Sequence, residues 1–383
     1  MLKVLQVVGT MNRGGAEVML MDILRNKPQD VHFDFLINNP PEDLKRQGVF
    51  DDEIISYGSR IRHIGTQLRI GPINYVRRFI EIFEELKPDV VHIHLNAKCG
   101  IIALAAYIAG CRKIITHCHA DIRFRGSLFS RVLCEIEMVF QKCLIACFGT
   151  DWWGCSVEAN RRLYWPCIRK HSRVINNSID LHQFLTVRQE YIDDIRASYQ
   201  LASDTIILGN VGRIVPHKNI AFIIDVMKVL RQRNIDVAFV IAGRDDTPEY
   251  TDSIRKKAEY YGIPQDRLIF LGERDDIPVL MHTFDVFVGP ALKEGFGLVA
   301  VEAQAAGVCC VLYSGFPESV DMKLGLCKRL HSFDPFEWAN VICTSLKYRT
   351  CITSTELASH IRENGFDVRE NAMTVCSMYY DIK

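Results

Sequence analysis

Two glutamates in one short segment are well placed for chemistry. Glu294 and Glu302 stand eight residues apart in E-G-F-G-L-V-A-V-E, on either side of the junction between a short apolar strand and a helix with a small-residue face. Gly295 and Gly297 let a backbone approach a ligand closely, and the helix start offers unpaired N–H groups that suit a phosphate. A carboxylate beside them suits sugar hydroxyls. The segment predicts a site for a phosphorylated sugar, and a helix-start charge plus a solvent-facing helix residue is the alternative interpretation.

Two cations follow another apolar strand. Arg213 and Lys218 lie five residues apart on the loop V-G-R-I-V-P-H-K-N, which Pro216 prevents from being helical throughout. Arginine can hold two phosphate oxygens with its planar fork and lysine adds a point charge, so the pair fits a diphosphate. A solvated surface pair is the plainer interpretation, but the position after a buried strand favours a ligand.

Glycines follow two further strands. The first strand runs into G-T-M-N-R-G-G-A-E, where Gly14 and Gly15 precede a helix, and a later strand ends at Gly243 in V-I-A-G-R-D-D. Because ligands collect at the carboxyl ends of parallel strands, Gly15 could admit a phosphate and Gly243 could line a nucleotide pocket. A simple turn explains either glycine equally well. The dinucleotide fingerprint G-x-G-x-x-G is absent.

Alternating histidines end two of the expected strands. His92 and His94 form one pair, and His117 and His119 the other, with Asp121 close behind. An H-x-H arm can bind zinc, but no cysteine or acidic cluster with ligand spacing completes a site, so we expect no metal. His119 is the candidate for contact with the sugar or the acceptor, although both pairs can also be core histidines.

Short apolar strands alternate with amphipathic helices along the chain, the pattern of parallel sheets covered on both faces. The alternation restarts after a charged segment, so we expect two doubly wound α/β domains, 1–185 and 186–366, with the ligand in the cleft between them. A terminal helix at about 367–383 is expected to return to the first domain. The expected strands are 3–8, 32–37, 90–94, 113–117, 144–149, 206–211, 236–242, 268–271, 284–289 and 308–313.

Composition limits the partners. Lys and Arg together number 46, as do Asp and Glu, so no net field points to nucleic acid. Fourteen scattered cysteines without a C-x-x-C pair indicate free thiols, and the first residues resemble a strand more than a secretion signal. The longest uncharged apolar stretch, 99–111, is well short of the roughly 20 residues that a spanning helix needs. We therefore expect a cytoplasmic protein.

A basic cluster suggests a peripheral partner. Its members are Arg161, Arg162, Arg169, Lys170 and Arg173, together with Trp165. Such a cluster could contact anionic lipid at the inner membrane face. A solvated helix face is the alternative.

Four motifs together resemble a known family. The motifs M-N-R-G-G-A-E, I-N-N-S-I-D-L-H-Q-F, V-G-R-I-V-P-H-K-N and E-G-F-G-L-V-A-V-E-A-Q-A-A-G are similar to those of retaining glycosyltransferase family 4. They span nearly the whole chain and follow one another in the order found in that family. The resemblance implies the GT-B fold, with two Rossmann-like domains facing across a deep cleft and a C-terminal helix returning to the first. M-N-R-G-G-A-E, V-P-H-K-N and T-D-W-W-G-C-S-V-E-A-N most resemble bacterial capsular and exopolysaccharide glycosyltransferases.

The resemblance also implies roles for single residues. Arg213 and Lys218 would hold the donor diphosphate, Glu294 the donor sugar and Glu302 the ribose, and His119 would lie near the reacting hydroxyl. The implied catalytic residues are Arg213, Lys218, Glu294 and His119. The implied donor-binding residues are Gly15, Gly243, Glu294, Gly295, Phe296, Gly297, Leu298, Val299 and Glu302. Ser178 departs from the family, which usually has glycine in this interdomain turn.

The function implied is transfer of a sugar, with retention of configuration, from a nucleotide diphosphate sugar to a hydroxyl of a glycan or a lipid-linked acceptor. UDP is the expected nucleotide, and neither a metal nor another cofactor is expected. A nucleotide-sugar epimerase of the same fold, or a non-catalytic nucleotide-sugar-binding partner subunit, is the alternative.

Overall fold

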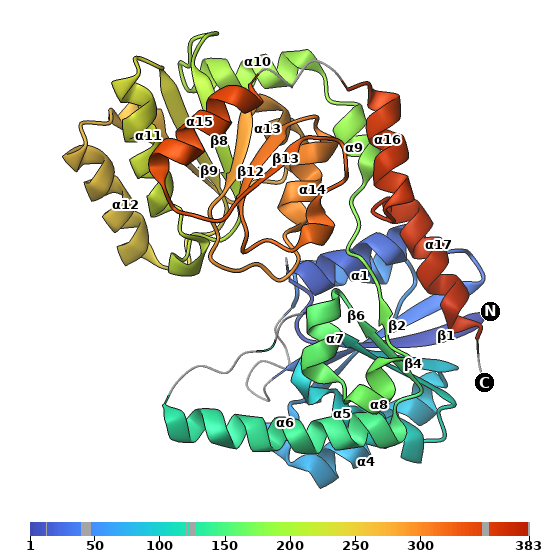
Figure 1. Cartoon of the computed structure of the whole chain (residues 1–383). Helices are drawn as coiled ribbons and strands as arrows, with labels where there is room; N and C mark the ends of the chain where they lie inside the picture. Colours follow the sequence, from blue (N-terminus) through green and yellow to red (C-terminus); the bar gives the residue numbers. More distant parts are fainter. Residues whose placement is uncertain (13, 40–46, 120–121, 123–126, 347–351, 382–383) are drawn as a thin grey trace. The chain divides into compact units, whose positions relative to one another are not determined.

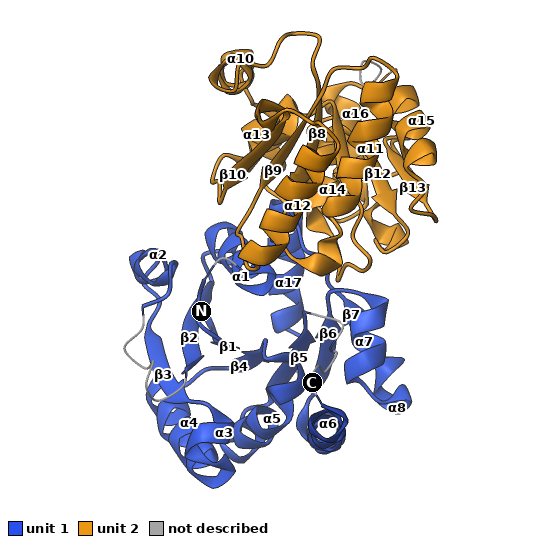
Figure 2. Cartoon of the chain, turned by 90° about the vertical axis from the view of Figure 1, so that its left-hand side faces the viewer, with its two compact units in different colours: residues 1–178, 368–383 blue, residues 179–367 orange. Residues whose placement is uncertain are grey.

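The computed structural model describes residues 1–12, 14–39, 47–119, 122, 127–346 and 352–381. The chain forms two compact units, colored separately in Figure 2. Unit 1 comprises residues 1–178 and 368–383, and unit 2 comprises residues 179–367. The expected domain limits, residues 185 and 366, lie near residues 179 and 367, where unit 2 begins and ends.

Unit 1 contains a seven-stranded parallel sheet in the order β3-β2-β1-β4-β5-β6-β7. The strands are β1 Leu2–Val8, β2 Val31–Asn39, β3 Ile61–Gly65, β4 Val90–Ile93, β5 Lys113–Cys118, β6 Asp151–Gly154 and β7 Arg173–Val174. After β3 the chain returns to the other side of β1, so the strand order reverses between β1 and β4. Such a switch point leaves a crevice at the carboxyl ends of the two strands.

Helices cover both faces of this sheet (Figure 1). They are α1 Gly15–Asn26, α2 Asp51–Ser56, α3 Gln67–Ile70, α4 Pro72–Leu86, η2 Asn96–Lys98, α5 Cys99–Ile108, α6 Leu128–Phe148, α7 Val157–Leu163, α8 Pro166–Arg169 and α17 Val368–Tyr379. Helix α17 packs on α1 and buries Val375 and Tyr379 in the core of unit 1. The predicted return of the C-terminal helix to the first domain is confirmed.

Unit 2 repeats the design with six parallel strands in the order β10-β9-β8-β11-β12-β13. The strands are β8 Ile206–Val211, β9 Val237–Ala242, β10 Leu268–Gly272, β11 Val286–Gly289, β12 Cys309–Tyr313 and β13 Cys327–Leu330. The helices are α9 Leu181–Leu185, α10 Gln189–Ser198, η3 Pro216–Lys218, α11 Ala221–Gln232, α12 Pro248–Tyr260, η4 Gln265–Arg267, α13 Ile277–Thr283, α14 Leu298–Ala305, η5 Glu318–Val320, α15 Pro335–Ser345 and α16 Ser354–Glu363. Its switch point lies between β8 and β11, and separate apolar cores lie on the two faces of the sheet. The doubly wound α/β prediction is confirmed for both units.

One predicted strand is wrong. Residues 144–148 belong to α6, and the strand that follows is β6, which pairs Trp152 with Thr116 of β5. The apolar run at 144–148 continues a helical face, because Met138, Gln141 and Ile145 are buried at helical spacing. A short apolar run cannot be assigned to strand or helix by hydrophobicity alone, which explains the error.

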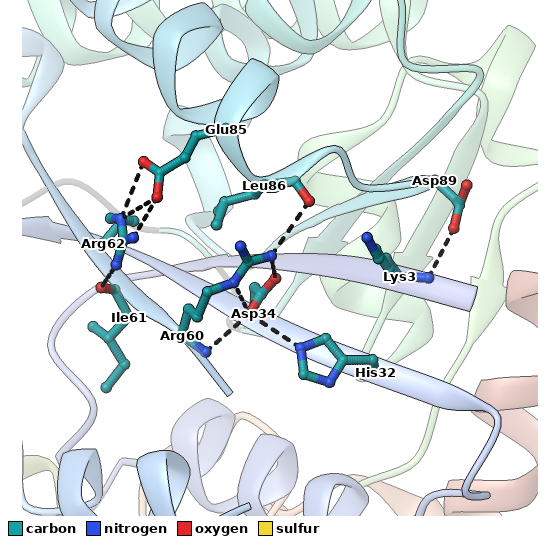
Figure 3. Close-up of polar contacts among 9 residues, drawn as sticks. All are labelled: Lys3, His32, Asp34, Arg60, Ile61, Arg62, Glu85, Leu86 and Asp89. Carbon is teal, nitrogen blue, oxygen red and sulfur yellow. Dashed lines mark hydrogen bonds and ion pairs between the residues drawn. The ribbon is translucent and has the colours of Figure 1, made fainter. Parts of the chain in front are cut away.

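A buried carboxylate joins β2 to the chain before β3 (Figure 3). Asp34 is 3% exposed, and Arg60 Nη2 lies 2.7 Å from its Oδ2 while the Arg60 amide donates to Oδ1 at 2.8 Å. Burial by itself raises the pKa of Asp34, but the hydrogen bonds from Arg60, with the charge of His32 nearby, outweigh burial and hold this pKa below its ordinary value. Asp34 is therefore charged and paired. The Arg60 guanidinium also donates to the carbonyl of Leu86 at the end of α4.

We predict that Arg60→Met destabilises the protein by about 3 kcal/mol, because it removes the guanidinium from a buried carboxylate that keeps only the backbone amide of residue 60 and His32 as partners. Arg62→Met is the matched control, since it breaks the pair with the exposed Glu85 and should cost less than about 1 kcal/mol. Urea unfolding at pH 7 measures both. The contribution of charged Asp34 to the free energy of unfolding is present above the pKa of Asp34 in the unfolded chain and is lost as pH falls through its folded pKa. The two variants should therefore have similar free energies of unfolding in acid. Equal losses at pH 7 would refute this account.

Candidate functional site

The predicted donor-binding residues of unit 2 gather at its switch point. Arg213 and Lys218 follow β8, and Glu294 lies on the loop after β11, the strand that pairs with β8. Asn210 near the end of β8 donates to the carbonyl of Val288 on β11 at 2.8 Å, which ties the two strands together near their carboxyl ends. The loops that carry the charges therefore start from neighbouring points of one rigid sheet.

Lys218 and Glu294 form an ion pair in which Nζ contacts Oε1. Their side chains are only 19% and 11% exposed. Lys218 ends the short helix η3, after Pro216, and the Glu294 amide donates to the carbonyl of Gly315 at 3.0 Å, which anchors its loop beside the end of β12. Two side chains 76 residues apart in sequence are thus held together in a mostly water-excluded position.

Gly297 sets the start of α14. Its φ of 86° is left-handed, and a Cβ at this position would lie 2.5 Å from Phe316 Cδ1, so only glycine fits without rearrangement. Leu298 and Val299 begin the helix, and their amides belong to the first turn, which lacks intrahelical acceptors. The helix start therefore presents N–H donors beside Glu294.

The neighbouring predicted residues divide between open and packed positions. An added Cβ at Gly295 would meet nothing within 4 Å, so open space lies beside this backbone. Phe296 is 6% exposed and its ring packs 5.5 Å from that of Phe366, so only its backbone is available to a ligand. Glu302 lies partly buried one turn into α14.

Arg213 has a partner that the sequence analysis missed. Its side chain is 57% exposed, and Nη1 lies 3.2 Å from Asp246 Oδ2. Arg244 Nε lies 2.5 Å from the other oxygen of Asp246. The Arg244 guanidinium, with Arg213 as a further donor, lowers the pKa of Asp246 below its ordinary value. The motif V-I-A-G-R-D-D contains both Arg244 and Asp246, but nothing in the letters assigns Arg213 as their partner.

Gly243 is required by packing. Its φ is 142°, and an added Cβ would lie 2.0 Å from the carbonyl oxygen of Gly212. The ends of β8 and β9 approach so closely here that no side chain fits. This explains the glycine without a ligand, so its predicted role in lining a nucleotide pocket stays a prediction.

Gly15 and His119 belong to unit 1. Gly15 is the first residue of α1, and an added Cβ there would meet nothing within 4 Å, so the packing does not demand a glycine. His119 follows β5, and its amide donates to Asn96 Oδ1 at 2.7 Å. Asp121, named with the histidines in the sequence analysis, lies outside the described residues.

The His119 ring is oriented through His94 by Gln6. His94 Nε2 lies 2.9 Å from Gln6 Oε1, which can only accept, so His94 carries its proton on Nε2. His94 Nδ1 therefore accepts from His119 Nε2 at 2.7 Å. The proton of His119 is then on Nε2, and its buried Nδ1 keeps a lone pair that has no hydrogen-bond partner among the described residues.

The same amide directs a second chain of hydrogen bonds. Gln6 Nε2 donates to the Tyr379 hydroxyl at 3.3 Å, and that hydroxyl lies within hydrogen-bond distance of His92 Nδ1, at 2.8 Å. His92 Nε2 in turn lies 3.2 Å from His117 Nδ1. Sequence reasoning missed Gln6 and Tyr379 as members of this network, since they lie 373 residues apart.

Burial keeps the four histidines neutral. It lowers the pKa of His119 to about 3 and the pKa values of His92, His94 and His117 well below 6.5. The sequence argument against a metal was that no further ligand completes a site, yet nitrogens of His92, His94 and His117 lie within 4.8 Å of one another. The Nδ1 atom of each of these three lies within hydrogen-bond distance of another member of the network, whereas the buried His117 Nε2 has no hydrogen-bond partner among the described residues. The absence of a metal stays a prediction.

Ser178 is accommodated at the turn where a glycine was expected. It is 3% exposed and is not among the described residues with positive φ, so its side chain causes no backbone strain. Asn371 of α17 donates to Ser178 Oγ at 3.1 Å and to the carbonyl of Asn176 at 2.7 Å. The serine contributes a bond to the C-terminal helix.

Two doubly wound α/β units, the second with an ion pair and a helix start at its switch point, are the architecture of GT-B glycosyltransferases. Comparison with known proteins agrees. The model for glycosyl transferases group 1 matches residues 192–327, and the model for Glycosyltransferase Family 4 matches residues 13–183. EpsF of Bacillus subtilis (strain 168) is 32% identical over 98% of this chain and 96% of its own length. The chain belongs to glycosyltransferase family 4.

Other relatives are more distant. The capsular polysaccharide biosynthesis glycosyltransferase CapH of Staphylococcus aureus is 25% identical, with 99% of each chain covered. The Escherichia coli UDP-Gal:alpha-D-GlcNAc-diphosphoundecaprenol alpha-1,3-galactosyltransferase is 27% identical over 82% of this chain and 81% of its own. The crystal structure of Anabaena HepE in complex with UDP has a TM-score of 0.73 at 18% identity, covering 100% of this chain and 96% of that one, which shows the shared fold.

We predict that His94 and His119 hold their protons on Nε2 and that none of the four buried histidines titrates between pH 5 and 8. Because unfolded histidine binds a proton below about pH 6.5 and the folded cluster does not, stability is complete above that pH. It should fall below it by about 1.4 kcal/mol per pH unit for each such histidine. Imidazole ¹⁵N NMR measures the tautomers, with the exposed His171 as reference. A buried-histidine signal that titrates near pH 6.5 would contradict the network.

Proposed function

We propose that this protein is a retaining, metal-independent glycosyltransferase that moves a sugar from a UDP-sugar to a hydroxyl of a glycan or lipid-linked acceptor in bacterial capsular or exopolysaccharide synthesis. The observation that carries the proposal is the Lys218–Glu294 pair beside the start of α14 at the switch point of unit 2. Cation, carboxylate and helix N–H groups match the diphosphate, sugar hydroxyls and phosphate oxygens of one donor.

In the proposed reaction, negative charge grows on the departing diphosphate. Arg213, Lys218 and the amides at the start of α14 are donors and cations for that charge, and they stabilise it more in the transition state than in the ground state. Because these groups supply positive charge themselves, we expect no metal ion to be needed. Glu294 would bind sugar hydroxyls and Glu302 the ribose.

In this proposal the acceptor hydroxyl attacks the anomeric carbon on the face from which the diphosphate departs, so the anomeric configuration is retained. The bond from the anomeric carbon to the diphosphate breaks, the bond to the acceptor oxygen forms, and the acceptor proton passes to the leaving phosphate oxygen. Glu294 is paired with Lys218, which favours a binding role for this acid over that of a nucleophile. The Nδ1 lone pair of His119 would accept a hydrogen bond from the acceptor hydroxyl and orient it.

The relatives support the choice of substrates. The Escherichia coli relative is named for a UDP-galactose donor, a diphosphoundecaprenol-linked acceptor and an α-1,3 linkage, and CapH is named for capsular polysaccharide synthesis. A lipid-linked acceptor fits with peripheral contact at the inner membrane face. Every described cysteine is a free thiol, which supports a cytoplasmic location. The described part of the chain holds no helix with the length and hydrophobicity of a membrane span.

We predict that Arg213→Ala lowers the rate of sugar transfer by about 10²-fold, as loss of one charge-stabilising donor does. Because Arg213 is largely exposed, thermal unfolding should stay near that of the native protein. Lys256→Ala, at an exposed position of α12, is the control and should transfer sugar normally. Release of UDP in the presence of an extract that contains the acceptor measures the rate. A normal rate for Arg213→Ala would contradict the role proposed for this residue.

Thermal shift against a set of nucleotide diphosphate sugars should single out the donor, which at 100 times its dissociation constant stabilises by about 2.7 kcal/mol. Lys218→Ala should abolish that shift, and it should itself cost about 1–3 kcal/mol because Glu294 loses its partner in a mostly buried position. If no UDP-sugar shifts the melting temperature of the native protein, the donor class proposed here is wrong.

A further inference from the structure

The outward side of α6 is apolar along most of its length. This 21-residue helix lies at the outer edge of unit 1 (Figures 1 and 2) and buries Met138, Gln141 and Ile145 against the domain. The large apolar side chains on its other side are 47–76% exposed, and we call them the α6 stripe. They are Leu128, Phe129, Val132, Leu133, Ile136, Val139 and Phe140.

The stripe is continuous. At 100° per residue its members fall within an arc of about 140°, centred opposite the buried side of the helix. Single exposed apolar residues are ordinary, but a contiguous apolar surface of this length is typical of an interaction site. Among the described residues, the side chains of the stripe are left exposed by the packing of unit 1.

Basic side chains outnumber acidic ones on α6 and the elements near it, and we call these basic residues the basic flanks. Within η2, α5, α6, α7 and α8, the basic residues are Lys98, Arg131, Lys142, Arg161, Arg162 and Arg169, and the acidic ones are Glu135, Glu137 and Glu158. Two of the acids are already paired, Glu135 with Arg162 and Glu137 with Lys98. Six basic groups against three acidic ones, in a chain with 46 of each, concentrate positive charge around α6.

An aromatic residue marks the border of this surface. Trp165, at the start of α8, lies under Lys142 Nζ at 4.4 Å from the ring centroid, and Lys142 also donates to the carbonyl of Arg162. These contacts join α6 to the basic helices α7 and α8. Tryptophan beside lysine and arginine is typical of the boundary between headgroups and acyl chains.

We propose that α6 lies flat on an anionic lipid bilayer, with the α6 stripe between headgroups and acyl chains and the basic flanks on the headgroups. A long apolar face with cationic borders is the signature of an interfacial helix. A second copy of the chain is the competing occupant, but symmetric pairing through α6 would bring two positive flanks together. The inference deepens the peripheral contact proposed above and does not depend on the transfer chemistry.

Flotation with vesicles tests the proposal. The native protein should float with vesicles of phosphatidylglycerol and phosphatidylcholine and bind pure phosphatidylcholine at least tenfold less. The double variant Phe129→Gln/Ile136→Gln should bind the anionic vesicles at least tenfold less than the native protein. Leu68→Gln/Ile73→Gln is the matched control, since these side chains are 86% and 83% exposed on α3 and α4 of the same unit, and it should float normally.

The proposal is overturned if the native protein stays at the bottom of the gradient, or if the stripe variant floats as well as the control. Light scattering identifies the competing occupant: a native dimer that the stripe variant converts to a monomer, without flotation, assigns the surface to a second copy. Thermal shift by UDP should be the same for all variants. If UDP does not shift the melting temperature of the native protein, the proposed function is contradicted. Normal flotation of the same protein would still support lipid binding by α6.

Discussion

The parallel arrangement of the strands is the constraint on which the rest of this structure depends. All carboxyl ends of a parallel sheet meet one edge, and a loop can descend into that edge only where the strand order reverses. In unit 2 this happens between β8 and β11, and the loops after these strands carry Lys218 and Glu294. In unit 1 the reversal lies between β1 and β4, which are followed by the α1 start and His94. Lys218, Glu294 and the start of α1 therefore lie at the positions where the topology leaves a crevice at the sheet edge.

Charge and its neutralisation are distributed differently at the two switch points. In unit 2 both predicted phosphate-binding cations have an acidic partner: Lys218 pairs with Glu294, and Arg213 with Asp246. A diphosphate that enters the site would replace the carboxylates as the partner of these cations. Before a donor binds, the site therefore need not hold unpaired cations close together. In unit 1 the switch point holds neutral rings, and hydrogen bonds that begin at Gln6 fix the tautomers of His94 and His119. The first arrangement suits a charged ligand and the second suits a hydroxyl.

The sequence was informative where the physics is local. Strands covered on both faces give continuous apolar runs, so β8 was predicted at its observed limits, and the glycines around 297 indicated a helix start. It was uninformative where distant residues decide. The run at 144–148 looked like a strand because its helical partners on α5 are remote in sequence, and the short β3, with Arg62 and His63 in it, carries little apolar signal. The link from Gln6 to Tyr379, and the partner of Arg213, depend on register and packing that no spacing encodes.

The position of α17 has a consequence for biosynthesis. Tyr379 of α17 is fully buried in the core of unit 1 and hydrogen-bonds to His92, while the whole sequence of unit 2 separates it from the other helices of that core along the chain. A ribosome makes the N-terminal part first, yet that part remains without one of its covering helices until α17 emerges. Unit 2 is one contiguous stretch of the chain, so all of its residues have been synthesised before α17 is. The order in which the two units complete their folding is therefore the reverse of the order in which they begin to be made.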